Sequence, residues 1–160
     1  SYLYKRYFPV YEDVSWVAGG SVGWADAYGD SDELPFYENF FAGGFSTVRG
    51  YDTNSLGPRD VNDSDDPIGG NLRLLGSTEI VFPVPYVNSK SIRMSGFIDC
   101  GNVFGTTDFS VDWDEIRFTT GLGIYWLSPL GSLKFSFAHP LNKREEDKTK
   151  VFQFSMGTAL

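Results

Sequence analysis

Apolar and polar residues alternate along most of this chain with a period of two, which is the period of a β-strand. Between Val14 and Tyr28, for example, Trp16 and Trp24 fall on one set of alternate positions, and small residues fill much of the other. No segment has a convincing helical period of 3.6 residues. The pattern predicts an all-β protein of about seven strands. The expected strands are Tyr2–Val10, Val14–Tyr28, Asn71–Val84, Ser91–Phe104, Glu115–Leu127, Leu133–Ala138 and Val151–Leu160.

The expected strands are long. Most have ten or more residues, whereas strands of soluble sheets typically have about five or six. About ten alternating residues are what a tilted strand needs to cross a bilayer. One face of nearly every strand is apolar and bulky, and the other is small or charged. The apolar faces would contact lipid in a membrane barrel or form the core of a soluble sandwich, and alternation alone fits both.

The spacing of aromatic residues favours the membrane barrel. Trp16 and Trp24 lie on the same face of one expected strand, and Phe118 and Trp126 lie on the same face of another. Each pair is separated by about 20 Å along the membrane normal, given about 3.3 Å per residue and a tilt near 40°. That distance is close to the separation of the two aromatic girdles of an outer-membrane barrel.

A connection of about forty residues, about 28–69, separates the second and third expected strands and has no clean period. Loops of this length inside a compact domain are usually functional or disordered. This one contains paired glycines, Arg49 and six aromatic residues, so we expect it to be ordered. It either forms a surface loop with its own hydrophobic cluster or folds back and buries Arg49. The aromatic residues are Phe36, Tyr37, Phe40, Phe41, Phe45 and Tyr51.

If the loop folds into a barrel lumen, Arg49 needs acidic partners, because an unpaired guanidinium away from bulk water is costly. Alternation places Glu79 and Asp99 on the lumen-facing side of neighbouring strands. These two carboxylates are therefore the expected partners of Arg49. The alternative is an ordinary surface contact for this arginine.

Composition restricts the class of protein. The chain has 160 residues, with 13 Lys and Arg against 21 Asp and Glu, and a net charge of −8. It has no basic stripe, so a nucleic-acid partner is not expected. Cys100 is the single cysteine, which rules out an intrachain disulfide. No run of eighteen apolar residues predicts a transmembrane helix. An odd strand count and a start within a strand indicate the C-terminal part of a larger barrel.

The sequence gives little support for catalysis or cofactor binding. His139 is the only histidine and lies at an expected strand end, so no catalytic site is predicted. The acidic stretch Asp60–Asp66 lacks the central glycine and closing glutamate of an EF-hand, and no metal site is predicted. The glycine-rich segment Gly19–Gly23 has no lysine or helix after it, which disfavours phosphate binding. We therefore expect a protein that is not an enzyme and has no cofactor.

Several long motifs carry a family resemblance. The loop reads FYENFFAGGFSTVRGY and is followed by SLGP. Further motifs follow in order: GGN at Gly69–Asn71, EIVFPVP at Glu79–Pro85, FIDCGNVF at Phe97–Phe104, GIYWLSPLG at Gly123–Gly131 and FQFSMG at Phe152–Gly157. In this order they resemble the BamA family, the barrel-assembly insertases of the Gram-negative outer membrane. The resemblance covers essentially the whole chain.

The resemblance implies an antiparallel transmembrane barrel of sixteen strands. Residues 1–160 would be about its last seven strands, and the periplasmic POTRA domains would lie outside this chain. The long loop would enter the lumen and be anchored there. The last strand would form one side of a lateral gate, with a kink near Gly157. The implied anchor consists of Val48, Arg49, Gly50 and Tyr51 with Glu79 and Asp99, and the implied gate residues are Phe152, Phe154 and Gly157.

The implied function is the folding and insertion of β-barrel proteins into the outer membrane through that gate. The implied partners are unfolded outer-membrane barrel proteins, assembly lipoproteins bound through the periplasmic domains, and the lipid bilayer. Two features depart from the family: the chain ends in Leu160 instead of an aromatic residue, and the loop after Pro58 is short and acidic. The alternatives are a two-partner secretion or autotransporter-assembly transporter, a small outer-membrane pore with a loop plug, and a soluble β-sandwich binding module.

Overall fold

The fold is all-β, as the alternation predicts. The computed structural model describes residues 1–25, 38–60, 66–85, 91–105, 111–129 and 131–157. Its seven strands form a single antiparallel sheet in which each strand pairs with the next one along the chain. The strands are β1 (Tyr2–Tyr11), β2 (Val14–Trp24), β3 (Leu72–Pro83), β4 (Ile92–Phe104), β5 (Arg117–Ser128), β6 (Gly131–Pro140) and β7 (Phe152–Gly157), and one 3₁₀ turn, η2 (Trp113–Glu115), precedes β5.

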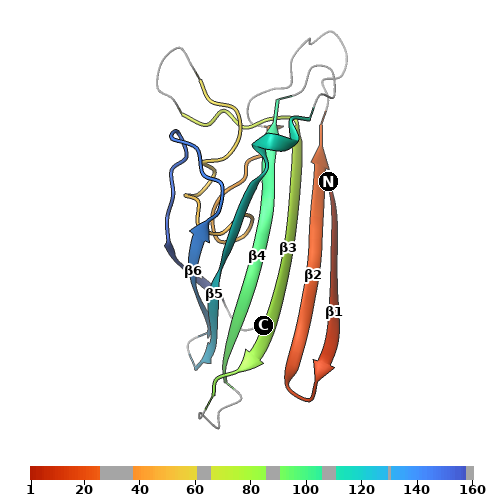
Figure 1. The fold of residues 1–160 in the computed structure, drawn as a ribbon, viewed down its shortest axis with the longest axis vertical. Coiled ribbons are helices and arrows are strands. Elements are labelled where there is room, and N and C mark those ends of the chain that lie inside the picture. The colour runs from red at the N-terminus through yellow and green to blue at the C-terminus, as the bar shows by residue number, and fades with distance from the viewer. Residues whose placement is uncertain (26–37, 61–65, 86–90, 106–110, 130, 158–160) are drawn as a thin grey trace.

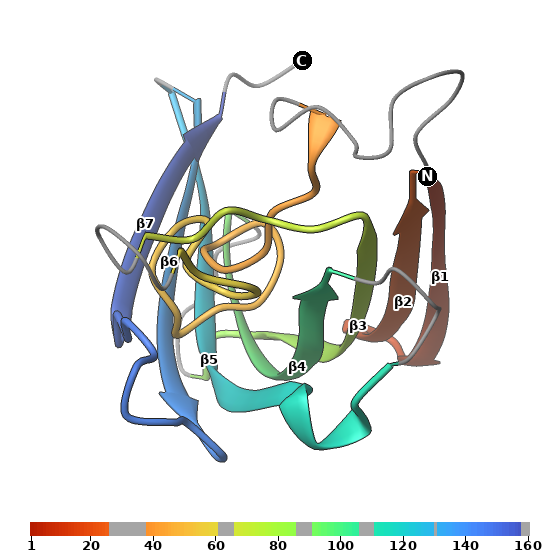
Figure 2. The ribbon, with the colours of Figure 1, turned by 90° about the horizontal axis from the view of Figure 1, so that it is seen from above.

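The sheet is a tall, curved wall (Figure 1). Seen from above, it forms an open arc, and residues of the long connection between β2 and β3 lie inside its concave side (Figure 2). We call the described residues 38–60 of this connection the inner loop, and the concave side of the sheet its inner face. No helix long and apolar enough to cross a membrane occurs in the described ranges.

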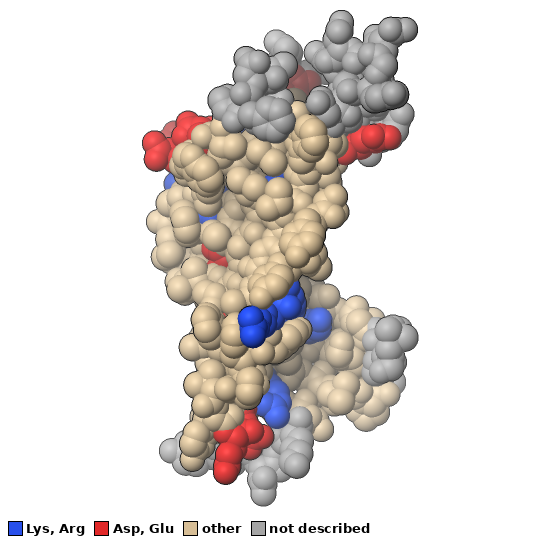
Figure 3. All heavy atoms as spheres, turned by 90° about the vertical axis from the view of Figure 1, so that its right-hand side faces the viewer, with Lys and Arg blue, Asp and Glu red and all other residues tan. Residues whose placement is uncertain are grey.

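The outer face carries the large apolar residues. Trp16, Trp24, Phe118 and Trp126 are all 41–50% exposed, so each aromatic pair indicated by the sequence lies on the outside of the wall. The indole N–H of Trp16 donates to the Thr78 hydroxyl at 2.7 Å, which satisfies this donor on an apolar surface. Figure 3, which looks onto the right-hand side of Figure 1, shows a mostly uncharged face with basic side chains near its middle.

The inner face is built from small and polar residues whose rows cross the strands. The register places Ser77 opposite Asp99, and Asp99 opposite Thr119. Gly123 lies opposite Ser95, and a Cβ at Gly123 would collide with the Ser95 hydroxyl. The small residues therefore leave room on the inner face for larger side chains and for the inner loop.

The inner loop has a small hydrophobic core of its own. Its buried members pack against the upper part of β4, with Phe40 and Leu75 packed around them. This core explains why the loop is ordered without any regular period. The buried residues are Ala42, Val48, Tyr51 and Leu56 from the loop and Val103 from β4.

Several strand boundaries differ from the expected ones. β1 extends to Tyr11, one residue beyond the expected end at Val10, and Pro9 is tolerated within it because β1 is an edge strand among the described residues. Glu115 belongs to η2, where the Asp112 side chain caps the turn through the Asp114 N–H, and β5 begins at Arg117. The expected strand residues 26–28 and 158–160, and the loop aromatics Phe36 and Tyr37, lie outside the described residues.

Candidate functional site

The tip of the inner loop is a tight turn that presents Arg49 to the sheet. The Gly43 N–H donates to the Thr47 hydroxyl at 2.9 Å, and the Gly44 N–H donates to the Val48 carbonyl at 3.2 Å. Gly50 has a φ of 92°, a conformation that favours glycine. A Cβ at Gly50 would lie 3.0 Å from that of Ala138, so the backbone approaches β6 closely at this residue.

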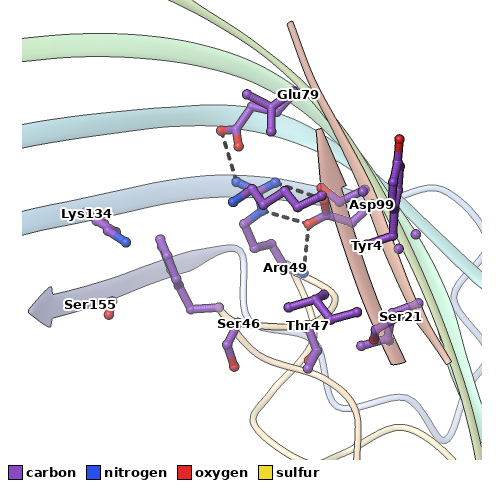
Figure 4. A pocket seen from close by; sticks show the side chains of 18 of the residues that line it. Tyr4, Ser21, Ser46, Thr47, Arg49, Glu79, Asp99, Lys134 and Ser155 are labelled. Carbon is purple, nitrogen blue, oxygen red and sulfur yellow. Dashed lines mark hydrogen bonds and ion pairs between the residues drawn. The ribbon is translucent and has the colours of Figure 1, made fainter. Parts of the chain in front are cut away.

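Arg49 forms a two-pronged ion pair with Asp99 of β4. Its Nε lies 2.7 Å from Asp99 Oδ2 and its Nη2 lies 2.8 Å from Oδ1, while its backbone N–H also donates to Oδ2 at 3.3 Å (Figure 4). The Ser77 hydroxyl donates to Oδ1 at 2.7 Å. The side chains of Arg49 and Asp99 are only 7% and 1% exposed, respectively. Such bidentate, charge-assisted geometry is the strong form of an arginine–carboxylate contact.

Glu79 of β3 is the second acidic partner and the weaker one. Its Oε1 accepts from Arg49 Nη1 at 3.3 Å. The same oxygen accepts shorter bonds of 2.6 Å from the Ser95 hydroxyl and from the Tyr125 hydroxyl. Glu79 is therefore held by β4 and β5, and it contributes to Arg49 mainly through its charge.

The ring of Phe97 completes the surroundings of Arg49. The guanidinium carbon lies 3.4 Å from the ring centroid, which is a close cation–π contact. Burial by itself lowers the pKa of Arg49. The Asp99 hydrogen bonds and the charges of Asp99 and Glu79 raise the pKa by more than burial lowers it, so the net shift is upward. Arg49 is thus a permanent cation held by two strands.

Val48 and Tyr51, which flank the Arg49–Gly50 pair, are fully buried in the loop core. The Tyr51 hydroxyl makes no hydrogen bond among the described residues. Burial raises the pKa of Tyr51 to about 12, with the charge of Asp147 raising it further and that of Arg117 lowering it. All four residues of the segment Val48–Tyr51 thus lie on the concave side of the sheet, against its inner face.

The expected gate residues lie on β7, the last strand. Phe152 and Phe154 face outward, are 48% and 53% exposed, and lie beside Phe135 with ring centroids 6.5 and 5.5 Å away. Gly157 is the last residue of β7 and lies opposite Ser132. The side chains of Phe152 and Phe154 point to the face opposite the Arg49 cluster.

Three important polar residues were not singled out from the sequence. Gln153, between the two outward phenylalanines, reaches the inner loop from β7. Arg117 and Asp147 form a second buried ion pair, with 2.6 Å between Nε and Oδ2. Alternation already places Gln153 and Arg117 on the inner face, so that signal existed. Asp147 lies in an irregular charged connection, where no period points to it.

A pocket of about 370 Å³ lies beside Arg49, between β1, the loop tip and β7 (Figure 4). Its lining is mixed and includes Lys5, Thr47, Lys134 and Ser155. Within the described residues, no group of three or more His, Cys, Asp and Glu side chains could hold a metal ion. His139 is exposed, and of the acidic stretch 60–66 the residues 61–65 lie outside the described part.

The chain is similar to known outer-membrane proteins over nearly its whole length. It is 36% identical to the outer membrane protein assembly factor BamA of Neisseria meningitidis serogroup B over 95% of its own length and 22% of that protein. It is 32% identical to BamA of Nitratidesulfovibrio vulgaris over 78% of its own length and 16% of that protein. It thus spans about a fifth of the curated relatives that it matches.

A solved structure gives the same result for the fold. The crystal structure of BamA from Haemophilus ducreyi lacking POTRA domains 1–3 superposes with a TM-score of 0.85 at 30% identity. The match covers 95% of this chain and 33% of that one. The resemblance seen in the motifs is therefore confirmed. The family model described as the Omp85 superfamily domain matches residues 1–160, and the chain belongs to the Omp85 superfamily.

Proposed function

We propose that this chain is the C-terminal part of the barrel of a bacterial outer-membrane insertase, which folds β-barrel proteins and inserts them into the bilayer. The observation that carries the proposal is the inner loop held by Arg49, Asp99 and Glu79 on the concave side of a wall with an apolar outside. The similarity to BamA proteins over 95% of the chain supports it. The proposed location is the bacterial outer membrane.

The proposed mechanism uses the free edge of the last strand. Among the described residues, β7 pairs with β6 only, and in the proposed barrel its other edge would face the first strand, outside residues 1–160. When that seam opens, the backbone groups along this edge become available. An unpaired edge can template a strand of another chain by main-chain hydrogen bonds. Phe152 and Phe154 would then face lipid next to the incoming strand, and Gly157 would allow the gate strand to bend. This process needs no covalent chemistry.

The proposed assembly extends beyond this chain. We propose a barrel of sixteen strands, of which β1–β7 are the last seven, and periplasmic domains that lie outside residues 1–160. The proposed partners are unfolded outer-membrane barrel proteins, assembly lipoproteins that bind the periplasmic domains, and the lipid bilayer. The net charge of −8 offers no attraction to nucleic acid.

Substitution of Arg49 in the full-length protein tests the proposal. Arg49→Ala removes the cation that joins the inner loop to β3 and β4, so the level of assembled porin should fall while the variant still reaches the outer membrane. Heat-modifiable mobility of porins on gels measures assembly, and fractionation measures the variant itself. Arg144→Ala, which removes an exposed ion pair with Glu115, is the matched control. A wild-type porin level with Arg49→Ala would remove the proposed role of this anchor.

A further inference from the structure

Gln153 connects the last strand to the backbone of the inner loop. Its side-chain oxygen accepts from the Gly50 N–H at 3.2 Å, and its side-chain nitrogen donates to the Tyr51 carbonyl at 2.7 Å. The residue is 5% exposed. One amide thus satisfies a donor and an acceptor of two consecutive loop residues that lie more than a hundred positions away in the sequence.

A short backbone ladder lies directly before β7 and joins the same loop residues. The Asp52 N–H donates to the Lys148 carbonyl at 2.8 Å, and the Lys150 N–H donates to the Gly50 carbonyl at 2.9 Å. Tyr51 and Thr149 form the antiparallel bridge between them. Both backbone polar groups of Gly50 are therefore bonded to β7 or to the segment that leads into it.

The lead-in segment is itself fixed to the wall. Asp147 accepts from Arg117 Nε at 2.6 Å and from Nη2 at 3.2 Å, and it also accepts from the Arg144 N–H at 2.7 Å. The Arg117 and Asp147 side chains are 6% and 4% exposed. The lead-in segment thus begins at Asp147, which is held by β5, and continues through the ladder into β7, where Gln153 contacts the loop.

The rest of β7 lacks such contacts. Ser155 faces the same side as Gln153 but makes no side-chain hydrogen bond among the described residues, and Gly157 has no side chain to offer. Beyond Gln153, β7 is held by its pairing with β6 and by the contact of Phe154 with Phe135 on the outer face. The two halves of this strand are therefore attached to the molecule in different ways.

We propose that Gln153 is a positioning residue that couples β7 to the inner loop. The loop and the first residues of β7 move as one unit, and bending of β7 starts at the Ser155–Gly157 end. This inference rests on the proposed function in one respect, namely that β7 is the strand that opens. The coupling itself is a property of the contacts and can be measured without any substrate.

Hydrogen exchange on the full-length protein in detergent micelles tests the coupling. Gln153→Met keeps the length of the side chain and removes both hydrogen bonds, so amide exchange should rise about tenfold both at Gly50–Asp52 and along β7. Ser155→Ala, two residues along on the same face, is the matched control and should leave both regions unchanged. Faster exchange in the loop alone, with β7 as in the wild type, would overturn the proposal.

A reversible cross-link tests the coupling independently of whether Gln153→Met folds. Tyr51 and Thr149 form a bridge flanked by hydrogen bonds on both sides, which brings their Cβ atoms close together. Cysteines at both positions, in a Cys100→Ser background, can form a disulfide between the loop and the lead-in segment. Relative to the reduced form of the same protein, the oxidised form should show slower exchange in β7 up to Gln153. Equal exchange in the two forms would contradict the coupling.

Porin assembly distinguishes the coupling from the proposed function. If both hold, Gln153→Met speeds exchange in β7 and lowers porin assembly, whereas Ser155→Ala does neither. If the coupling exists but the chain is not part of an insertase, exchange changes and porin assembly stays at the wild-type level. If porin assembly falls with Arg49→Ala but exchange in β7 is unaffected by Gln153→Met, the function stands and the coupling is wrong.

Discussion

Two buried arginines hold irregular segments to the inner face, and they do so in opposite senses. Arg49 belongs to the inner loop and finds its carboxylates on the wall, at Asp99 and Glu79. Arg117 belongs to β5 and finds its carboxylate, Asp147, in the connection between β6 and β7. The shortest N–O distances are almost equal, at 2.7 Å for Arg49–Asp99 and 2.6 Å for Arg117–Asp147. All four of these side chains are less than 10% exposed.

The surroundings of the two ion pairs differ. Asp99 accepts four hydrogen bonds, from Arg49 and Ser77, and Phe97 covers the guanidinium. Both pairs line pockets, of about 370 Å³ at Arg49 and Asp99 and about 510 Å³ at Arg117 and Asp147, and the Arg117 guanidinium donates one further bond to the Glu115 carbonyl. Removing Asp99 deprives four donors of their acceptor and leaves Arg49 a 3.3 Å bond to Glu79. Removing Asp147 deprives three donors and leaves Arg117 a 2.9 Å bond to the Glu115 carbonyl. The comparison predicts unequal costs for removing each carboxylate.

The largest effect is expected for Asp99→Ala. It leaves Arg49 with only the 3.3 Å contact to Glu79, so the free energy of unfolding should fall by about 3–5 kcal/mol, the usual cost of breaking a buried pair. Urea unfolding of the full-length protein in lipid vesicles, followed by tryptophan fluorescence, measures this change. A loss below about 1 kcal/mol would mean that water replaces the contacts of Arg49 with Asp99 at little cost.

An intermediate effect is expected for Asp147→Ala. Arg117 keeps its 2.9 Å bond to the Glu115 carbonyl, and fewer donors lose their acceptor than at Asp99, so the loss should be about 1–3 kcal/mol. The same urea titration measures it. A loss equal to that of Asp99→Ala would show that the two pairs are equivalent, contrary to the comparison.

The smallest effect is expected for Glu79→Gln. The glutamine oxygen can still accept from Ser95 and Tyr125, and only the charge facing Arg49 is lost, so the loss should be about 0.5–1.5 kcal/mol. Comparing the cost of Glu79→Gln in the wild-type and Asp99→Ala backgrounds measures the coupling between the two carboxylates. Glu79 should matter more once Asp99 is absent, and strictly additive costs would show that the two carboxylates act independently.

Alternation predicted the wall and part of the site for a simple physical reason. In a strand, the side-chain direction depends only on the parity of the position, so Glu79 and Asp99 could be assigned to one face without coordinates. The structure places both within 3.3 Å of Arg49. The strand boundaries were less predictable: a local cap places Glu115 in a 3₁₀ turn, so β5 begins two residues later than expected.

The inner loop could not be derived in the same way. Its conformation depends on contacts with residues far away in the sequence, such as the one between Gly50 and Gln153. Asp147 lies in a charged connection, and no period indicates which of its acidic residues turns inward to Arg117. Irregular segments lack the periodic rule that assigns faces in strands, so their partners emerge only from the folded arrangement.

The meander order of the strands has a consequence for the order of folding. Each strand pairs with its neighbour in sequence, so most of the wall can form from hairpins as successive segments come together. The Arg49–Asp99 contact spans 50 residues, and the Gly50–Gln153 contact spans 103. Contacts with such long closures form late, because the entropy of closing the chain is lost before they contribute. We therefore expect the inner loop to dock only when the last strand is in place, so that protection of Gly50 in pulse-labelled exchange reports the completion of this wall.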